Sequence, residues 1–313
     1  MRNNEGVAPV GAPPGVSVLL VVKNERRNLE RSFDVIAGQQ YGGPVEFVCI
    51  DSGSTDGTLE FLQERRVTAH VIPPDEFHHA RTRNLAAGMA RHAILVLLSG
   101  DAIPTDDRWL ANLVAPFDDP AVGAVYGKQI PPPGTGAVRA HGLAYLYPDA
   151  QETRVLPADG TVELRLIRFS NANCAVRAEL WRKYKFPDTS LVAEDHYICY
   201  RTLKDGLKVV YEPKAAVIHG HERSIWGEFQ FAVDNAISLK RMGILDDPNI
   251  GSEIKYGMDR IRSDLGYFAG KGMYACALRS LAVSAVKWVG VQFGKREKRM
   301  PDWFLRAISE NMK

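Results

Sequence analysis

The first hundred residues alternate between short apolar runs and segments with helical periodicity. Continuous apolar runs of strand length occupy Val16–Val22 and Ile94–Leu98, and two further short strands are expected at Val45–Ile50 and at residues 67–72. Apolar side chains recur at helical spacing over residues 28–40, from Thr58 onward and over residues 80–91. Runs this short and this continuous are typical of strands buried on both faces. The alternation therefore predicts an α/β fold with a doubly wound, mostly parallel, Rossmann-like sheet.

The pattern becomes less regular after residue 100. We expect strands at 121–127, 207–210 and 215–218, loops at 130–136 and 148–160, and helices from Arg177 and over Glu194–Lys204. Beyond residue 224 the periodicity is mostly helical. The chain thus divides into a loose tail rich in Gly, Pro and Ala (1–15), an α/β unit (16–225) and a helical C-terminal region (226–313).

Composition narrows the class of protein. The net charge of +2 over 313 residues argues against a nucleic-acid partner. The four cysteines form no C-x-x-C pair, which favours reduced core thiols over a zinc site or disulfides. No apolar run reaches the ~18 residues of a membrane span, and no signal peptide is apparent, so we expect a cytoplasmic protein.

Polar side chains follow several of the predicted strands. Lys23, Asn24 and Glu25 follow the first, Asp51 the second, Ser99-Gly100-Asp101 a later one and His219 the segment near 218. Ligands of open parallel sheets bind beyond the carboxyl ends of the strands, so these side chains are expected to share a cleft. The alternative is that they are ordinary polar loop residues.

The stretch from Asp51 to Thr58, DSGSTDGT, has two interpretations. The Asp51 carboxylate, with Ser52 beside it, suits a nucleotide base or ribose, whereas Ser54, Thr55 or Asp56 suits the N-cap of the next helix. The first strand is not followed by G-x-G-x-x-G, and residues 127–129 lack the spacing of a P-loop. A dinucleotide-dependent Rossmann enzyme is therefore not indicated.

Glu194 and Asp195 form a second acidic cluster, at the start of a predicted helix. Adjacent acids suit the positive end of a helix dipole, which is the structural interpretation. The functional interpretation makes one of them a general base. Arg201 lies two helical turns further along, so it is expected to pair with Glu194 and leave Asp195 free.

His219 and His221 fall on one face of an extended segment, because strand side chains alternate with a period of two. Two imidazoles with a carboxylate such as Asp101 make a set that suits Mn²⁺ or a similar ion.

Taken together, these motifs resemble the family 2 glycosyltransferases with the GT-A fold. The resemblance rests on residues 21–25, the D-x-S-x-D-G-T segment, Arg83-Asn84, Asp101, and Glu194-Asp195 with Arg201, and covers roughly residues 16–225. Residues 77–84 and 100–104 are similar to the rhamnosyltransferase-like branch.

The resemblance implies a nucleotide-sugar donor, dTDP- or UDP-linked, such as dTDP-rhamnose, bound by a nucleotide half (16–127) and used by an acceptor half (128–225). The implied donor-site residues are Lys23, Asn24, Glu25, Asp51, Ser52, Arg83, Asn84, Gly100, Asp101 and Asn173. Asp195, next to Glu194, would deprotonate the acceptor hydroxyl, with inversion at the anomeric carbon.

The resemblance also implies a divalent cation, Mn²⁺ or Mg²⁺, held by Asp101 and by His219 or His221. Ser99 replaces the first acid of the family's D-x-D motif, so we expect weak metal binding in the absence of nucleotide. The acceptor would be a glycan or a lipid-linked sugar. The alternative functions are a sugar nucleotidyltransferase and a nucleotide-sugar-binding protein without turnover.

Residues 271–299 combine an apolar, helical stretch with basic residues at its end. They predict either an interfacial helix on an anionic membrane, or a helix packed on the catalytic unit or on a second subunit of a homo-oligomer.

Overall fold

The computed structural model of the protein describes residues 13–251 and 253–312. The predicted loose tail, residues 1–15, lies almost wholly outside this range. Four parallel strands form one half of a mixed sheet, in the spatial order β3 (Ala69–Val71), β2 (Val45–Asp51), β1 (Val16–Val22) and β4 (Ile94–Ser99). These four strands are the ones expected from the first hundred residues, and all of β1 except Val21 is buried.

The other half of the sheet contains reversed strands. It continues from β4 through β8 (Asn173–Arg177), β6 (Val122–Ile130) and β9 (Lys208–Ile218) to β5 (Ile103–Pro104), and β7 (Glu152–Arg154) also pairs with β9. Strand β8 runs antiparallel to both of its neighbours. The prediction of separate strands at 207–210 and 215–218 was wrong, because both belong to β9, whose pairing with β6 continues past a register shift.

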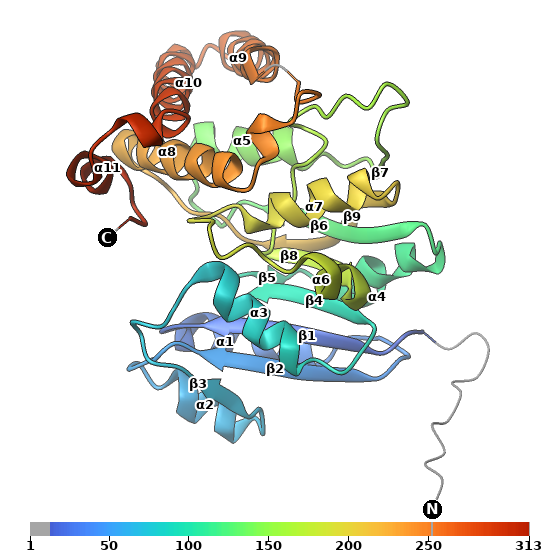
Figure 1. The fold of residues 1–313 in the computed structure, drawn as a ribbon. Coiled ribbons are helices and arrows are strands. Elements are labelled where there is room, and N and C mark those ends of the chain that lie inside the picture. The colour runs from blue at the N-terminus through green and yellow to red at the C-terminus, as the bar shows by residue number, and fades with distance from the viewer. Residues whose placement is uncertain (1–12, 252, 313) are drawn as a thin grey trace, which may run out of the picture.

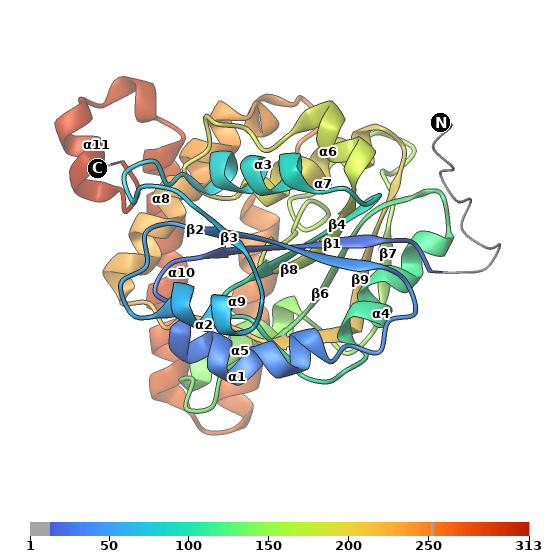
Figure 2. The same cartoon turned by 90° about the horizontal axis from the view of Figure 1, so that it is seen from below.

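Helices cover both faces of the sheet, as Figure 2 shows from below. One face carries α1 (Arg26–Ala37), α2 (Thr58–Glu64) and α4 (Trp109–Val114). Helix α1 buries Leu29, Phe33 and Ile36, whose spacing places them on one side of the helix against the sheet.

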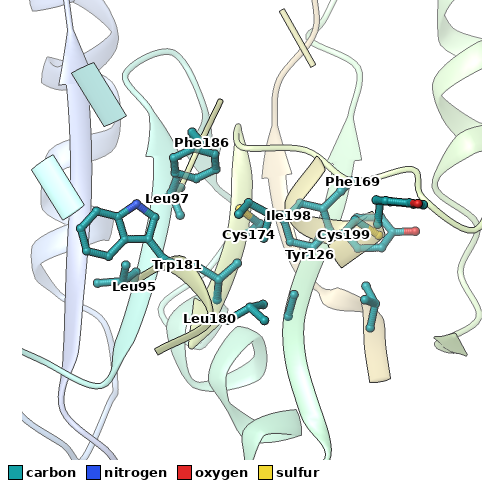
Figure 3. Packing of buried hydrophobic residues seen from close by; sticks show 14 of the residues in the cluster. Leu95, Leu97, Tyr126, Phe169, Cys174, Leu180, Trp181, Phe186, Ile198 and Cys199 are labelled. Carbon is teal, nitrogen blue, oxygen red and sulfur yellow. The ribbon is translucent and has the colours of Figure 1, made fainter. Parts of the chain in front are cut away.

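The opposite face carries α3 (His79–Met89), α6 (Ala178–Tyr184) and α7 (Glu194–Lys204). Figure 3 shows this core, in which Trp181 and Ile198 pack over residues of β4, β6 and β8. Doubly wound cover on both faces confirms the predicted fold class, and the parallel half brings the carboxyl ends of β1, β2 and β4 to one edge.

The C-terminal region is helical, as predicted. It contains α8 (Ile225–Arg241), α9 (Glu253–Gly270), α10 (Tyr274–Gly294) and α11 (Asp302–Ile308), which lie together at one end of the molecule beside α5 (Ala137–Leu146) (Figure 1). Short 3₁₀ turns cover Ala115–Asp118, Ile244–Asp246 and Glu297–Arg299. Among the described helices, none is long and apolar enough to cross a bilayer.

Two glycines let α10 approach α8 closely. A Cβ atom at Gly290 would lie 2.7 Å from the carbonyl oxygen of Phe229, and one at Gly294 would lie 2.5 Å from that of Val233. Both distances are below any real Cβ contact, so the spacing of the two helices requires glycine at both positions.

A buried carboxylate joins α5, α9 and α10. Asp264 on α9 is 2% exposed and accepts hydrogen bonds from Ser280 on α10 and from Arg260 on its own helix. His141 on α5 lies 3.3 Å from the same carboxylate. Because burying this charge is costly unless it is paired, the Ser280 contact holds α9 to α10, and the His141 contact ties these helices to the α/β unit.

All four cysteines are free, as expected, and Cys49, Cys174 and Cys199 are buried.

Candidate functional site

Asp101, His219 and His221 meet at the carboxyl edge of the sheet. The antiparallel pairing of Ile103 with Ile218 brings the segment after β4 beside the end of β9. The Nε2 atom of His219 lies 3.5 Å from Asp101 Oδ1, and that of His221 lies 3.1 Å from Asp101 Oδ2. One ligand atom from each residue lies within 4.8 Å of the others, so the three predicted metal ligands do come together.

The three side chains differ in exposure and protonation. Burial pushes the pKa of Asp101 upward, but the hydrogen bond from His221 and the nearby His219 outweigh it, so its pKa is lowered. Burial lowers the pKa of His219, which favours its neutral form. The hydrogen bond to Asp101 raises the pKa of the more exposed His221.

This donor set fits a divalent cation. One carboxylate oxygen and two imidazole nitrogens suit Mn²⁺. His219 Nδ1 lies 2.9 Å from Gln129 Oε1, and the amide nitrogen of Gln129 donates to Ser170 Oγ at 2.8 Å. Gln129 therefore holds His219 with its Nε2 lone pair toward Asp101, which is how ligating histidines are usually supported.

Asp195 lies in the first turn of α7 and contacts the segment that leads into β8. Its Oδ2 accepts a hydrogen bond from the Asn171 N–H at 3.1 Å, and its Oδ1 accepts one from the His196 N–H and faces His196 Nδ1, each at 2.8 Å. Burial pushes the pKa of Asp195 upward, but the His196 imidazole and these hydrogen bonds outweigh it, so its pKa is lowered. The carboxylate is thus kept ionised and able to accept a proton.

Glu194 is buried behind Asp195 and pairs with Arg83 of α3. Its Oε1 also accepts a hydrogen bond from the Asn171 side chain at 3.0 Å. The predicted pairing of Glu194 with Arg201 was wrong, because the Arg201 guanidinium lies 4.3 Å from the ring centre of Tyr184. Arg83 reaches Glu194 from another helix, a partnership that helical spacing cannot reveal.

The loops after β1 and β2 are joined by a seam of hydrogen bonds, which we call the strand-end seam (residues 23–26 and 51–58). Asn24, in the left-handed conformation with φ 56°, accepts from the Thr55 N–H at 2.8 Å, and its own N–H donates to Ser54 Oγ at 2.8 Å. The Glu25 N–H donates to Thr58 Oγ1 at 3.0 Å. The D-x-S-x-D-G-T segment therefore fixes the loop after β1 against the loop after β2.

Asp51 is fully buried within this seam, where its Oδ1 accepts from the N–H groups of Gly53 and Ser54 at 2.9 and 2.8 Å. The N-cap position of α2 is Gly57, so the N-cap expected at Ser54, Thr55 or Asp56 was wrong, although Asp56 Oδ1 accepts a hydrogen bond from the Thr58 N–H at 3.1 Å. Ser52 is also buried, and its N–H donates to the Val22 carbonyl at 3.0 Å. Contact of either side chain with a nucleotide base stays a prediction.

Gly100 and Glu25 lie together at the end of β4. A Cβ atom at Gly100 would lie 2.8 Å from Glu25 Cγ, so glycine permits this close approach. Burial raises the pKa of Glu25, and the nearby Asp101 carboxylate raises it further. A hydrogen bond from Asn28 acts in the opposite direction but does not cancel these two effects. Lys23 is exposed beside them.

Two predicted donor contacts, Asn84 and Asn173, have structural partners. Asn84 bonds the backbone of Phe186 and the Trp181 ring nitrogen. Asn173 is fully buried, accepts from Trp109 Nε1 at 2.9 Å and donates to two backbone carbonyls. Their geometry supports roles in the fold, and a donor contact stays a prediction.

Sequence reasoning missed Gln129 and His196. Only the pairing of strands brings Gln129 near His219: β6 pairs with β9, and Gln129 lies opposite Val217, two residues before His219. The sequence alone does not indicate this contact. His196 directly follows the predicted base and could have been found by its position alone.

The sequence is similar to a known protein family and to two curated relatives. Residues 17–173 match the family model described as "Glycosyl transferase family 2". The O-antigen chain rhamnosyltransferases RfbN of Salmonella typhimurium and WbaN of Salmonella anatum are each 26% identical, over 266 and 267 residues, and each alignment covers 84% of both chains.

Solved structures show the same fold. The mannosyltransferase PcManGT from Pyrobaculum calidifontis, in complex with GDP-Man and Mn²⁺, has a TM-score of 0.56 at 20% identity, with 95% of this chain and 85% of that chain covered. TarS 1–349 of S. aureus, in complex with UDP-GlcNAc, has a TM-score of 0.54 at 14% identity, with 91% and 92% covered.

Proposed function

This chain belongs to glycosyl transferase family 2, and from that premise we propose that it transfers rhamnose from a dTDP- or UDP-linked donor to a hydroxyl of a glycan or lipid-linked acceptor. The choice of rhamnose as the transferred sugar rests on the similarity to two O-antigen chain rhamnosyltransferases across 84% of both chains. Membership of the family makes the protein a glycosyltransferase and removes the nucleotidyltransferase and binding-only alternatives.

Asp195 is the proposed general base. Its carboxylate takes the proton of the acceptor hydroxyl while the acceptor oxygen forms a bond to the anomeric carbon. The bond from that carbon to the donor diphosphate breaks on the opposite side, so the configuration inverts and a nucleoside diphosphate leaves. The lowered pKa of Asp195, maintained against burial by His196 and the Asn171 N–H, supports this role.

Asp101, His219 and His221 are the residues that would hold a divalent cation, Mn²⁺ or Mg²⁺. A bound cation supplies Lewis-acid stabilisation of the negative charge that develops on the diphosphate. The protein contributes a neutral His219, oriented by Gln129, and a carboxylate with a lowered pKa. The structural neighbour that contains GDP-Man and Mn²⁺ supports this part of the proposal.

The strand-end seam and Arg83 are proposed to border the nucleotide-sugar donor. Glu194 is proposed to hold the Arg83 side chain in position. Arg83 Nη1 bonds Glu194 and the His79 carbonyl, so a donor phosphate would have to meet Nη2 or Nε of the same guanidinium.

The test is transfer to a lipid-linked acceptor from dTDP-rhamnose, UDP-GlcNAc and GDP-mannose, with and without Mn²⁺ or Mg²⁺. We expect dTDP-rhamnose to be used in preference and the product to have inverted anomeric configuration by NMR. Transfer from GDP-mannose alone would overturn the donor proposal. A retained configuration would overturn the role of Asp195.

A further inference from the structure

The outward face of α10 is apolar along its length. Tyr274, Leu278, Leu281, Trp288 and Val289 are 68%, 68%, 36%, 55% and 38% exposed. Their spacing of three, four and seven residues places them on one side of the helix, within a stripe about 100° wide. The opposite side packs inside the protein through Ser280, Gly290 and Gly294. We call this outward stripe the α10 face.

A continuous apolar face of this kind differs from scattered exposed residues, which are normal on soluble proteins. The exposed tryptophans are also concentrated in this region. Of the five tryptophans, Trp226, Trp288 and Trp303 are at least half exposed and all lie in the C-terminal helices, whereas Trp109 and Trp181 are buried. Exposed tryptophan is typical of surfaces that are apolar on one side and wet on the other.

Basic residues lie at both ends of α10, at Lys271 before it and over residues 295–299 after it. Residues 271–299 contain seven Lys or Arg and a single acid, Glu297. Glu297 is buried and pairs with Arg241, so it does not offset the charge at the surface. Arg279, Lys298 and Arg299 are exposed and form no ion pair within residues 13–251 and 253–312.

We propose that the α10 face docks on an anionic phospholipid bilayer. Its aliphatic and aromatic side chains would enter the boundary between headgroups and acyl chains, and the cations would meet lipid phosphates. A second copy of the chain fits less well, because cations lie at both ends of α10. Two such faces paired by a two-fold axis would bring like charges together.

This inference deepens the proposed function, and it rests on that function only in its reason for membrane contact, which is a lipid-linked acceptor. Helix α8, against which α10 packs, begins at Ile225, and His221 lies in the segment that leads into it. Docking by α10 would therefore hold the Asp101–His219–His221 cluster at a fixed position relative to the membrane.

The experiment is flotation of the full-length protein with vesicles of phosphatidylcholine alone and with vesicles that also contain phosphatidylglycerol, with neither donor nor acceptor present. We expect flotation with the anionic vesicles only, and loss of it at high salt. The double variant Leu278→Ser/Trp288→Ser should reduce the partition coefficient about tenfold or more. Lys298→Glu/Arg299→Glu should reduce it at least ~5-fold.

Matched control variants carry the same changes elsewhere. Val71→Ser/Met89→Ser removes exposed apolar side chains from β3 and α3, and Arg31→Glu/Arg182→Glu reverses exposed charges on α1 and α6. Both should float like the wild type. Equal flotation of the α10-face variants and the wild type would overturn the proposal, and so would a wild-type dimer in light scattering that the Leu278→Ser/Trp288→Ser variant converts to a monomer.

The two proposals fail separately. A protein that floats but transfers no sugar contradicts the proposed function alone. A protein that glycosylates a water-soluble acceptor but does not float contradicts membrane docking alone.

Discussion

His219 Nδ1 lies 2.9 Å from Gln129 Oε1, on the side of the imidazole ring that faces away from Asp101. The amide nitrogen of Gln129 is used by Ser170, so the amide oxygen is the group that His219 meets. An amide oxygen can only accept, and the proton of the neutral imidazole must therefore sit on Nδ1. The Nε2 atom is left with its lone pair directed into the Asp101–His221 cluster.

Replacing Gln129 with Leu should weaken Mn²⁺ binding about 10- to 100-fold, because His219 loses the partner that fixes its tautomer and ring orientation. Mn²⁺ affinity can be measured by electron paramagnetic resonance in the presence of nucleoside diphosphate. The ¹⁵N NMR shifts of His219 should show loss of the single tautomer. Gln151→Leu, which removes an amide bonded to Glu212, is the control and should leave Mn²⁺ affinity unchanged. Unchanged affinity in Gln129→Leu would contradict this role.

Asp195→Asn should lower kcat by about 10²- to 10⁴-fold, the usual contribution of a general base. The carboxamide oxygen can still accept the Asn171 N–H, so the local structure and donor affinity should be retained. Calorimetric donor binding and transfer rates separate the two effects. Asp188→Asn, at an exposed aspartate, is the control. A kcat within a few-fold of the wild type would assign the base elsewhere.

Asp247 predicts an acid-sensitive contribution to stability. The Tyr200 hydroxyl at 2.7 Å, the Asn249 N–H and Lys204 Nζ at 2.9 Å lower the pKa of Asp247 to about 2. Because the folded-state pKa lies below the ordinary value of 3.8, the contribution is present above that value and is lost as the pH falls toward about 2.

Tyr200→Phe removes the largest of these influences, so its free energy of unfolding should fall less steeply than that of the wild type across this acid window. Urea unfolding at a series of pH values measures the difference between the two curves. Asp188→Asn should follow the wild-type slope. Parallel curves for Tyr200→Phe and the wild type would rule out the coupling.

Gly290→Val should destabilise the protein by about 1–3 kcal/mol or more, because the added carbons would overlap the Phe229 carbonyl and force α10 away from α8. Gly266→Ala on α9 is the matched change at a helical glycine with open space around it. It should stabilise by about 0.5–1 kcal/mol through helix propensity. Thermal unfolding measures both, and effects of equal sign would show that the α8–α10 spacing does not depend on Gly290.

In the parallel half of the sheet, β1 and β4 could be predicted because they are buried on both faces. Burial on both faces leaves a continuous apolar run, and β1 and β4 fill these runs almost end to end. Strand β8 carries no such signal, since its five residues are Asn173–Arg177, polar at both ends. Its identity as a strand comes from pairing with β4 and β6, which are distant in sequence.

In the candidate site, too, some contacts could be predicted from the sequence and others could not. The strand-end rule brought Asp101 and His219 together, because it depends on topology that periodicity already indicates. The partner of Glu194 could not be predicted from local spacing. Arg83 and Glu194 are separated by 111 positions, and local spacing pointed instead to Arg201, whose guanidinium is occupied by Tyr184.

The strand-end seam also has a consequence for the kinetics of ligand capture. Asn24, Thr55 and Thr58 are held by hydrogen bonds within the protein itself, so these loops take their shape during folding. A nucleotide sugar arriving there would spend none of its binding free energy on ordering these loops. Association is then expected as a single phase whose rate scales with ligand concentration, and a slow, concentration-independent step would have to originate elsewhere in the molecule.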